Sequence, residues 1–237
     1  MASNSLAKKV RLLTVVATLA VAGCGLSWDG QRQNDNTRRV TTTKVPASGR
    51  YTVRTGDTLY SIAFRYGLDH KRLAAWNQLG SGALIYPGQT LRLKAPPNAR
   101  QTNTRAASLP AEQKRDWRWP TTGRVVAAFD PAAQVARTGI LVSGQRGQPV
   151  FAADGGEVVY SGSGLKGYGK LIIIRHDEHY LSAYGHNAAL LVAEGDSVKR
   201  GERIATMGST GAQQPRLHFE IRRLGKPIDP LPLLPRR

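Results

Sequence analysis

Two histidines in the C-terminal half of the chain are the side chains best suited to chemistry. His186 stands in the segment Tyr184-Gly-His186, and His218 stands in Arg216-Leu-His218-Phe-Glu220. A neutral imidazole can ligate a metal or act as a general base near neutral pH. The same two rings could equally be satisfied core or groove histidines, or contacts for a partner, and the sequence leaves these alternatives open.

Other catalytic arrangements have less support. His176 and His179 flank Asp177-Glu178 at the turn of a predicted hairpin, and a metal site there is conceivable. Polar residues of a hairpin turn are usually only solvated, so we expect no site. The nucleophile elbow Gly-x-Ser-x-Gly is missing from the sequence, and Ser-His-Asp hydrolysis therefore has no basis.

The elements that must position His186 and His218 are predicted to be short strands. Gly, Asp and Asn turns separate them, which is typical of an antiparallel sheet. Residues 171–174 are apolar without polar alternation, so this strand is expected at the centre of the core. The predicted strands are Val125 to Phe129, Pro149 to Ala153, Glu157 to Ser161, Leu171 to His176, Tyr180 to Tyr184, Arg203 to Met207 and Leu217 to Arg222.

Landmarks along residues 117–237 resemble the LytM-type fold of the M23 metallopeptidases, which cut peptidoglycan cross-bridges. They include Trp119-Pro120, Gly147-x-Pro149-Val150, Gly167-Tyr168-Gly169, Tyr184-Gly185-His186, Gly208-Ser-Thr-Gly211 and Leu217-His218-Phe-Glu220. In active members, zinc is held by the His and Asp of His-x-Gly-x-Asp and by the second His of His-x-His. The resemblance implies ligand positions at Arg137, Leu141 and His218, and catalytic positions at His186 and Arg216.

Three of these five positions carry residues that cannot perform the implied role. A catalytic zinc ion needs about three protein ligands. Leu141 has no lone pair to offer, while Arg137 and Arg216 stay protonated. We therefore expect no metal, no other cofactor and no enzymatic activity.

The vacant groove at the former active site of such a domain is predicted to bind a partner. Arg137, Arg216 and Arg222 could pair with carboxylates, for which the guanidinium group is well suited. The predicted groove comprises Arg137, Leu141, Tyr168, Tyr184, His186, Arg216 and His218.

Residues 51–95 resemble a LysM domain, a small α+β fold with the order strand, helix, helix, strand. Leu59, Ile62, Ala63 and Tyr66 follow the spacing of one helix face, with Asp57 or Thr58 as N-cap and Gly67 at the end. A second helix is expected from about Asp69 to Asn77. LysM domains bind N-acetylglucosamine polymers such as peptidoglycan. The resemblance implies contacts from two loops, namely Gly56, Asp57, Thr58, Leu59, Leu84 and Ile85.

The N-terminus has the pattern of a bacterial lipoprotein signal. Lys8, Lys9 and Arg11 accompany an apolar run that ends at Val21-Ala-Gly-Cys24, which predicts a signal peptide over residues 1–23. Cys24, the only cysteine, would carry the lipid, and several acyl chains anchor a protein stably. Gly25 rather than Asp at the next position favours the outer membrane of a Gram-negative bacterium, with the protein facing the periplasm.

Polar segments separate the folded regions. Residues 24–50 are predicted to form a flexible lipidated tether, and residues 96–116 a linker. The formal charge of +18, from 34 Lys and Arg against 16 Asp and Glu, favours polyanionic surroundings. Because the protein is expected to be exported, we expect a wall polymer or anionic lipid and no nucleic acid.

The order of lipobox, LysM domain and degenerate M23/LytM domain resembles the NlpD-type murein hydrolase activator lipoproteins. The resemblance implies a non-catalytic protein that binds peptidoglycan and activates a periplasmic N-acetylmuramoyl-L-alanine amidase during cell-wall remodelling and daughter-cell separation. Two alternatives are a zinc-dependent peptidoglycan endopeptidase with atypical ligands and a wall-tethering structural lipoprotein.

Overall fold

The structure is a computed structural model that describes residues 43–80, 84–97, 115–130 and 138–237. Residues 36–237 belong to one compact unit. We call residues 43–97 the LysM-like subdomain and residues 115–237 the M23-like subdomain. No helix within these ranges is long and apolar enough to cross a membrane. Cys24, Arg137 and the signal peptide lie outside the described residues.

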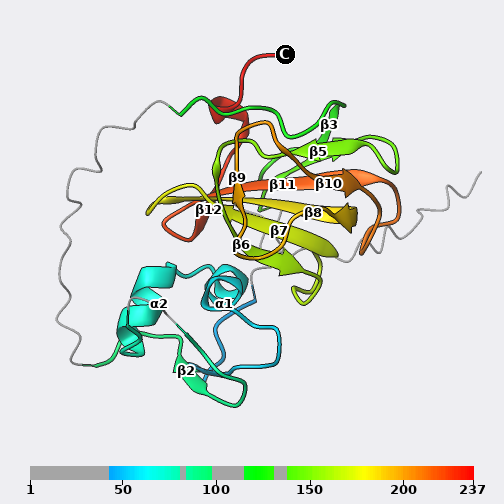
Figure 1. The fold of residues 1–237 in the computed structure, drawn as a ribbon. Coiled ribbons are helices and arrows are strands. Elements are labelled where there is room, and N and C mark those ends of the chain that lie inside the picture. The colour runs from blue at the N-terminus through cyan, green and yellow to red at the C-terminus, as the bar shows by residue number, and fades with distance from the viewer. Residues whose placement is uncertain (1–42, 81–83, 98–114, 131–137) are drawn as a thin grey trace, which may run out of the picture. The chain divides into compact units, whose positions relative to one another are not determined.

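The LysM-like subdomain has the predicted order of elements (Figure 1). Strand β1 (Arg50–Thr52) pairs antiparallel with β2 (Thr90–Arg92), and helices α1 (Leu59–Tyr66) and α2 (His70–Trp76) lie between them in sequence. Thr58 closes a capping box with Ser61, and Gly67 ends α1 in the left-handed conformation at φ 64°. These caps satisfy backbone groups that a helix end leaves free. The core of the LysM-like subdomain comprises Tyr51, Val53, Leu59, Ile62, Ala63, Leu73, Leu91 and Leu93.

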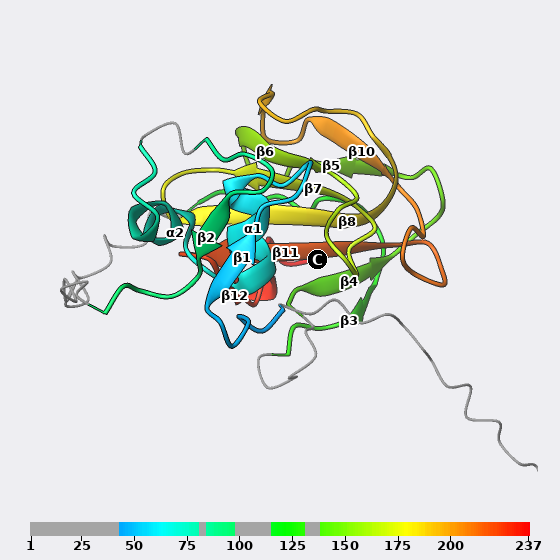
Figure 2. The same cartoon turned by 90° about the horizontal axis from the view of Figure 1, so that it is seen from below.

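The M23-like subdomain is built on an antiparallel sheet. Figure 2 shows its long central strands side by side, and their order is β3-β4-β11-β8-β7-β6-β9. The strands are β3 (Val125–Ala127), β4 (Ile140–Ser143), β5 (Pro149–Phe151), β6 (Gly156–Gly162), β7 (Lys170–Arg175), β8 (Tyr180–Leu190), β9 (Ser197–Val198), β10 (Arg203–Met207), β11 (Arg216–Arg223) and β12 (Lys226–Ile228). A short 3-10 helix (Leu231–Leu233) follows.

Side-chain alternation separates the two faces of this sheet. Along β11, Leu217, Phe219 and Ile221 enter the main core, and His218, Glu220 and Arg222 alternate with them. We call the face that carries His218 the groove face. All three polar side chains are buried, so they need partners on that face.

The predicted fold class is confirmed. Residues 171–174 are fully buried at the centre of the sheet, as expected from their unbroken apolar run. Strand β8 is six residues longer than predicted, because it continues from Tyr184 to Leu190. Strands β4, β9 and β12, of four, two and three residues, were not predicted from the sequence.

Candidate functional site

The register of the sheet brings His218 and Leu141 together. His218 on β11 lies directly opposite Leu141 on β4 and opposite Gly185 on β8. A Cβ added at Gly185 would lie 3.0 Å from the Tyr168 carbonyl oxygen and 3.3 Å from the His218 Cβ. Gly185 thus leaves room for the His218 and Tyr168 side chains to pack closely at the middle of the groove face.

His186 lies beside His218 in an unusual backbone conformation. Its φ is 65°, a left-handed value that is uncommon for residues other than glycine. The Nδ1 atom is 2.9 Å from the Thr210 carbonyl oxygen, and its ring centroid is 6.1 Å from that of His218. Burial, with the nearby His218 and Arg216, lowers the pKa of His186 to about 4. The ring is therefore neutral at pH 7 and hydrogen-bonded through one nitrogen.

The carboxylate of Glu220 organises the polar side chains next to His218. It accepts bonds from Thr138 Oγ1 at 2.9 Å and Tyr168 OH at 3.1 Å. His218 Nε2 lies 3.2 Å away, and Arg222 Nε donates at 2.5 Å. Burial alone would raise the pKa of Glu220, but Arg222 and His218 outweigh it and hold the pKa below its ordinary value. Glu220 is consequently a buried anion whose charge is compensated within the protein.

Tyr168 and Arg216 border the two histidines. The ring of Tyr168 meets that of His218 edge-on at 5.2 Å, and burial raises its pKa, so its hydroxyl stays protonated. Arg216 opens β11 and is half-buried, and its Nε is buried without a hydrogen-bond partner among the described residues. Arg216 is thus a cation at the end of the groove with capacity to bind a further acceptor.

Two residues considered for partner binding have internal contacts instead. Tyr184 points to the opposite, core face of the sheet, where its hydroxyl accepts from the Ala153 backbone N–H at 2.8 Å. Arg222, which could pair with a partner carboxylate, is paired in the structure with Glu220 of its own strand. Arg137 lies outside the described residues.

The donor set of this groove does not fit a catalytic zinc ion. Opposite His218, where a ligand is needed, Leu141 offers only aliphatic carbon. Within the ranges that the structure describes, no three His, Cys, Asp or Glu side chains are arranged to hold a metal. Zinc sites of catalytic type need about three such ligands, so we derive no metal-dependent step.

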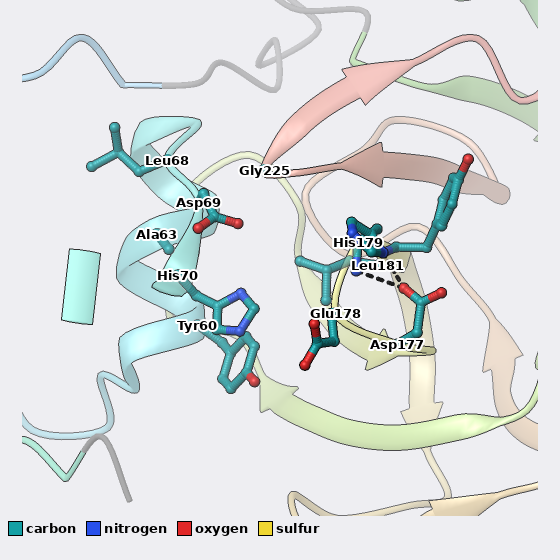
Figure 3. A pocket seen from close by; sticks show the side chains of 11 residues that line it. Tyr60, Ala63, Leu68, Asp69, His70, Asp177, Glu178, His179, Leu181 and Gly225 are labelled. Atoms are coloured by element: carbon teal, nitrogen blue, oxygen red, sulfur yellow. Dashed lines mark hydrogen bonds between the residues drawn. The ribbon is translucent and has the colours of Figure 1, made fainter. Parts of the chain in front are cut away.

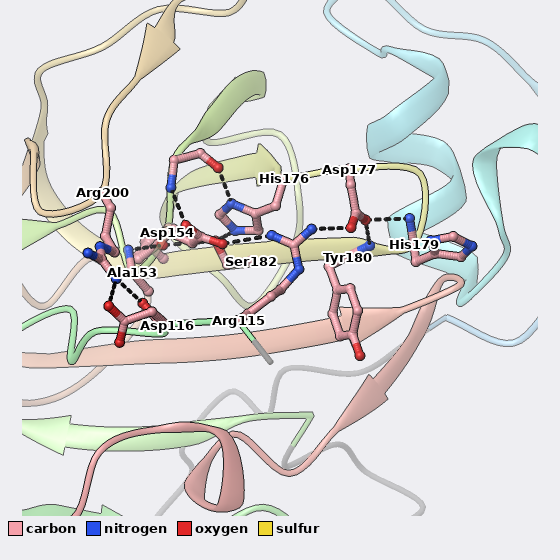
Figure 4. Close-up of polar contacts among 12 residues, drawn as sticks. Arg115, Asp116, Ala153, Asp154, His176, Asp177, His179, Tyr180, Ser182 and Arg200 are labelled. Carbon is pink, nitrogen blue, oxygen red and sulfur yellow. Dashed lines mark hydrogen bonds and ion pairs between the residues drawn. The ribbon is translucent and has the colours of Figure 1, made fainter. Parts of the chain in front are cut away.

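The hairpin histidine His176 has a structural setting. Its Nδ1 is 2.7 Å from the Gly155 carbonyl oxygen and its Nε2 is 2.7 Å from Ser182 Oγ. Figure 4 shows this ring beside Arg115, which forms ion pairs with Asp154 and Asp177. Burial lowers the pKa of His176. These contacts tie the segment that enters the M23-like subdomain to the β7–β8 hairpin.

The predicted peptidoglycan-binding residues have different exposures. Gly56, at φ 80°, has open space beside it, and Leu84 is 66% exposed. Asp57 is engaged with Arg65 and with the Tyr51 hydroxyl, while Leu59 is in the subdomain core. Leu84 thus offers apolar surface to a ligand, whereas Asp57 and Leu59 first stabilise the loop and helix. Thr58 is the N-cap of α1, and Ile85 packs against the same core.

Comparison with known families agrees with this architecture. The LysM domain family matches residues 51–94, and peptidase family M23 matches residues 135–230. The chain thus combines a LysM domain with an M23-type domain.

The similarity to whole proteins identifies the family. A lipoprotein NlpD/LppB homolog of Pseudomonas aeruginosa is 44% identical over 80% of this chain and 78% of its own length. The uncharacterized lipoprotein YgeR of Escherichia coli is 40% identical over 95% of this chain and 92% of its own length. The chain belongs to this family of NlpD/LppB-type lipoproteins. The murein hydrolase activator NlpD of Salmonella dublin is 50% identical over 60% of this chain, a match that spans 36% of that protein.

Proposed function

We propose that this chain is a non-catalytic outer-membrane lipoprotein that activates a periplasmic N-acetylmuramoyl-L-alanine amidase. The observation that carries the proposal is Leu141 opposite His218, beside polar side chains that are hydrogen-bonded to one another. A groove with an aliphatic residue at a ligand position cannot generate a metal-bound nucleophile. Arg216, whose Nε has no hydrogen-bond partner in the part of the chain that the structure describes, still suits binding of a carboxylate.

The relatives support the choice of partner class. One similar protein is named a murein hydrolase activator, and others are named lipoproteins. We infer that the LysM-like subdomain binds peptidoglycan and that Cys24 anchors the chain with the folded regions in the periplasm. In this arrangement the activator holds a hydrolase close to its substrate, which raises the effective concentration of the pair.

The direct test is reconstitution with purified components. A zinc amidase is incubated with purified peptidoglycan sacculi, with and without this full chain, and the released fragments are quantified. We expect release to rise when the chain is added. The chain alone, with zinc or with chelator, should release none, and chelator-sensitive cleavage by the chain alone would establish an endopeptidase instead.

A matched pair of variants locates the partner surface. Arg216→Glu should weaken activation about tenfold or more, because it replaces a donor of charge-assisted hydrogen bonds with a carboxylate that repels the carboxylate of the partner. Arg203→Glu is the control, because this substitution makes the same change in net charge. Arg203 is exposed and opens β10, at the end of that strand away from Arg216. Equal activation by both variants would remove Arg216 from the partner surface.

A further inference from the structure

Helix α1 has two apolar sides that face different subdomains. Leu59, Ile62 and Ala63 pack in the LysM-like core. Phe64 instead is buried in a cluster whose other members all come from the M23-like subdomain, and Tyr60 packs against that cluster. Residues four apart lie on the same helix side. The other members are Val159, Tyr160, Leu165, Tyr168, Leu171, Ile173, Leu181 and Ala183.

Arg222 fixes the end of this helix onto the groove face. Its Nη1 donates to the Phe64 carbonyl oxygen at 2.5 Å, and its guanidinium lies 3.5 Å from the centroid of the Phe64 ring. A cation near a helix C-terminus interacts favourably with the helix dipole, and a desolvated cation–π contact adds to it. Arg222 is only 1% exposed, so α1 and Glu220 together satisfy its charge.

Two further contacts lie at the edge of the interface between the LysM-like and M23-like subdomains. The Lys71 ammonium lies 2.9 Å from a carboxylate oxygen of Glu178, and both side chains are more than half exposed. Gly225 lies so close to Leu68 that an added Cβ would be 2.3 Å from its carbonyl oxygen. Figure 3 shows Tyr60 and Leu68 on the helical side of the narrow crevice, with Leu181 and Gly225 across from them.

The helix reaches the immediate neighbourhood of the degenerate site. The Phe64 ring contacts Tyr168 at 5.3 Å between centroids, and Tyr168 contacts His218 at 5.2 Å. Only one side chain therefore separates α1 from His218 on the groove face. A partner segment that extended from His218 towards Arg222 would meet Phe64 and Tyr60.

We propose that the LysM-like subdomain is a built-in competitor for the partner surface of the M23-like subdomain. In the closed state described here, α1 covers Tyr168, Leu181 and Arg222, and the amidase can use this part of the groove face only after α1 has moved away. Interfaces between parts of one chain resemble transient protein–protein interfaces, so α1 can leave without unfolding either core. The identity of the partner rests on the proposed function, whereas the covering of the surface does not.

Thiol labelling measures the covering without any partner. The full chain carries Cys24→Ser and Leu181→Cys, so that the only thiol lies under α1, where Leu181 is 8% exposed. Gly225→Ala is added to push Leu68 away. Gly195→Ala is the matched control, because Gly195 also has a positive φ, 94° against 78°, but has open space around it. We expect maleimide labelling of native protein to accelerate about tenfold with Gly225→Ala relative to Gly195→Ala, as overpacking favours the open state.

A second variant distinguishes opening of the interface from a local effect of Gly225→Ala on its own turn. Phe64→Ala removes the ring from Tyr168 and Arg222 but leaves the LysM-like core intact. It should also accelerate labelling. Equal labelling rates in all chains would overturn the covering of this surface.

Amidase reconstitution then tests the competition. Chains with the native Leu181 and either Gly225→Ala or Phe64→Ala should activate the amidase several-fold more strongly than the parent or Gly195→Ala. Faster labelling with unchanged activation would overturn the competition and leave the proposed function standing. No activation by any chain, including the parent, would refute the proposed function, and the labelling rates would still decide whether α1 covers the surface.

Discussion

The buried pair of Glu220 and Arg222 allows a quantitative prediction. Both side chains are at most 1% exposed, and they are joined at 2.5 Å. Removing one member of a buried ion pair leaves the other charge uncompensated, at a cost of about 3–5 kcal/mol. Arg222→Met keeps much of the volume and removes the charge, so we expect it to lower the free energy of unfolding by about this amount.

The double variant separates the charge pair from simple loss of packing. Glu220→Gln alone should also destabilise strongly, because it leaves the Arg222 guanidinium buried without its carboxylate. Arg222→Met combined with Glu220→Gln leaves no net buried charge, and such replacements are often close to neutral. The coupling energy from the cycle should be about 2 kcal/mol or more in favour of the double variant.

Urea unfolding at pH 7, followed by tryptophan fluorescence and circular dichroism, measures the four free energies. Coincident transitions are required before the values are compared. If the losses of the two single variants simply add in the double variant, the pair is not energetically coupled and the reasoning fails.

The lowered pKa of Glu220 gives a second check. The stability due to Glu220 is present above its unfolded pKa, roughly 4.3, and is lost as the pH falls through the lower folded value, so Glu220→Gln should remove this acid-side loss.

Three further predictions concern single positions. The pKa of His186, about 4, lies below the usual value of roughly 6.5, so stability should fall by about 3 kcal/mol as the pH drops from 6.5 to 4. His186→Asn, which tolerates the left-handed backbone, should flatten urea midpoints across this range, and an unchanged slope would contradict the assigned pKa. Asn77→Ala removes two side-chain bonds to Arg92 of β2 and one to the Leu73 carbonyl oxygen of α2, and should cost about 2–3 kcal/mol in the thermal unfolding of the LysM-like subdomain; a loss under 1 kcal/mol would be inconsistent with these bonds. Gly139→Ala places a Cβ 2.2 Å from the Phe219 carbonyl oxygen, whereas Gly80 has open space, so only Gly139→Ala should lower the melting temperature markedly.

Local signals explain why much of the fold could be predicted from the sequence. The helix α1 boundaries depend on a capping Thr58 and a terminal Gly67, and both act within a few residues of the chain. The apolar spacing of Leu59, Ile62 and Ala63 identifies the side that packs in the nearest core. The second apolar pair, Tyr60 and Phe64, could not be interpreted in the same way, because its partners are about a hundred residues away in sequence.

The candidate site was predictable in its residue types but less so in its pairing. Alternation along β11 places His218, Glu220 and Arg222 on one face, and this signal was present in the sequence. That Arg222 also donates to the Phe64 carbonyl depends on how α1 packs against β11, which the spacing of residues does not encode. Tyr184 was assigned to the groove from its motif, whereas strict alternation along β8 from the buried Tyr180 and Ser182 indicates the core face.

The electrostatics of the groove face explain how the protein accommodates a buried carboxylate there. A buried carboxylate in a metalloenzyme can be balanced by the metal and its ligands. In this chain, the Glu220 carboxylate is balanced by Arg222 and by hydrogen bonds from Thr138, Tyr168 and His218. Because Arg222 in turn depends on the Phe64 carbonyl, part of this balance comes from the LysM-like subdomain. Release of α1 would therefore expose the Arg222 guanidinium, still paired with Glu220, together with an apolar surface, and both suit an amphipathic partner that supplies an acceptor in place of the Phe64 carbonyl.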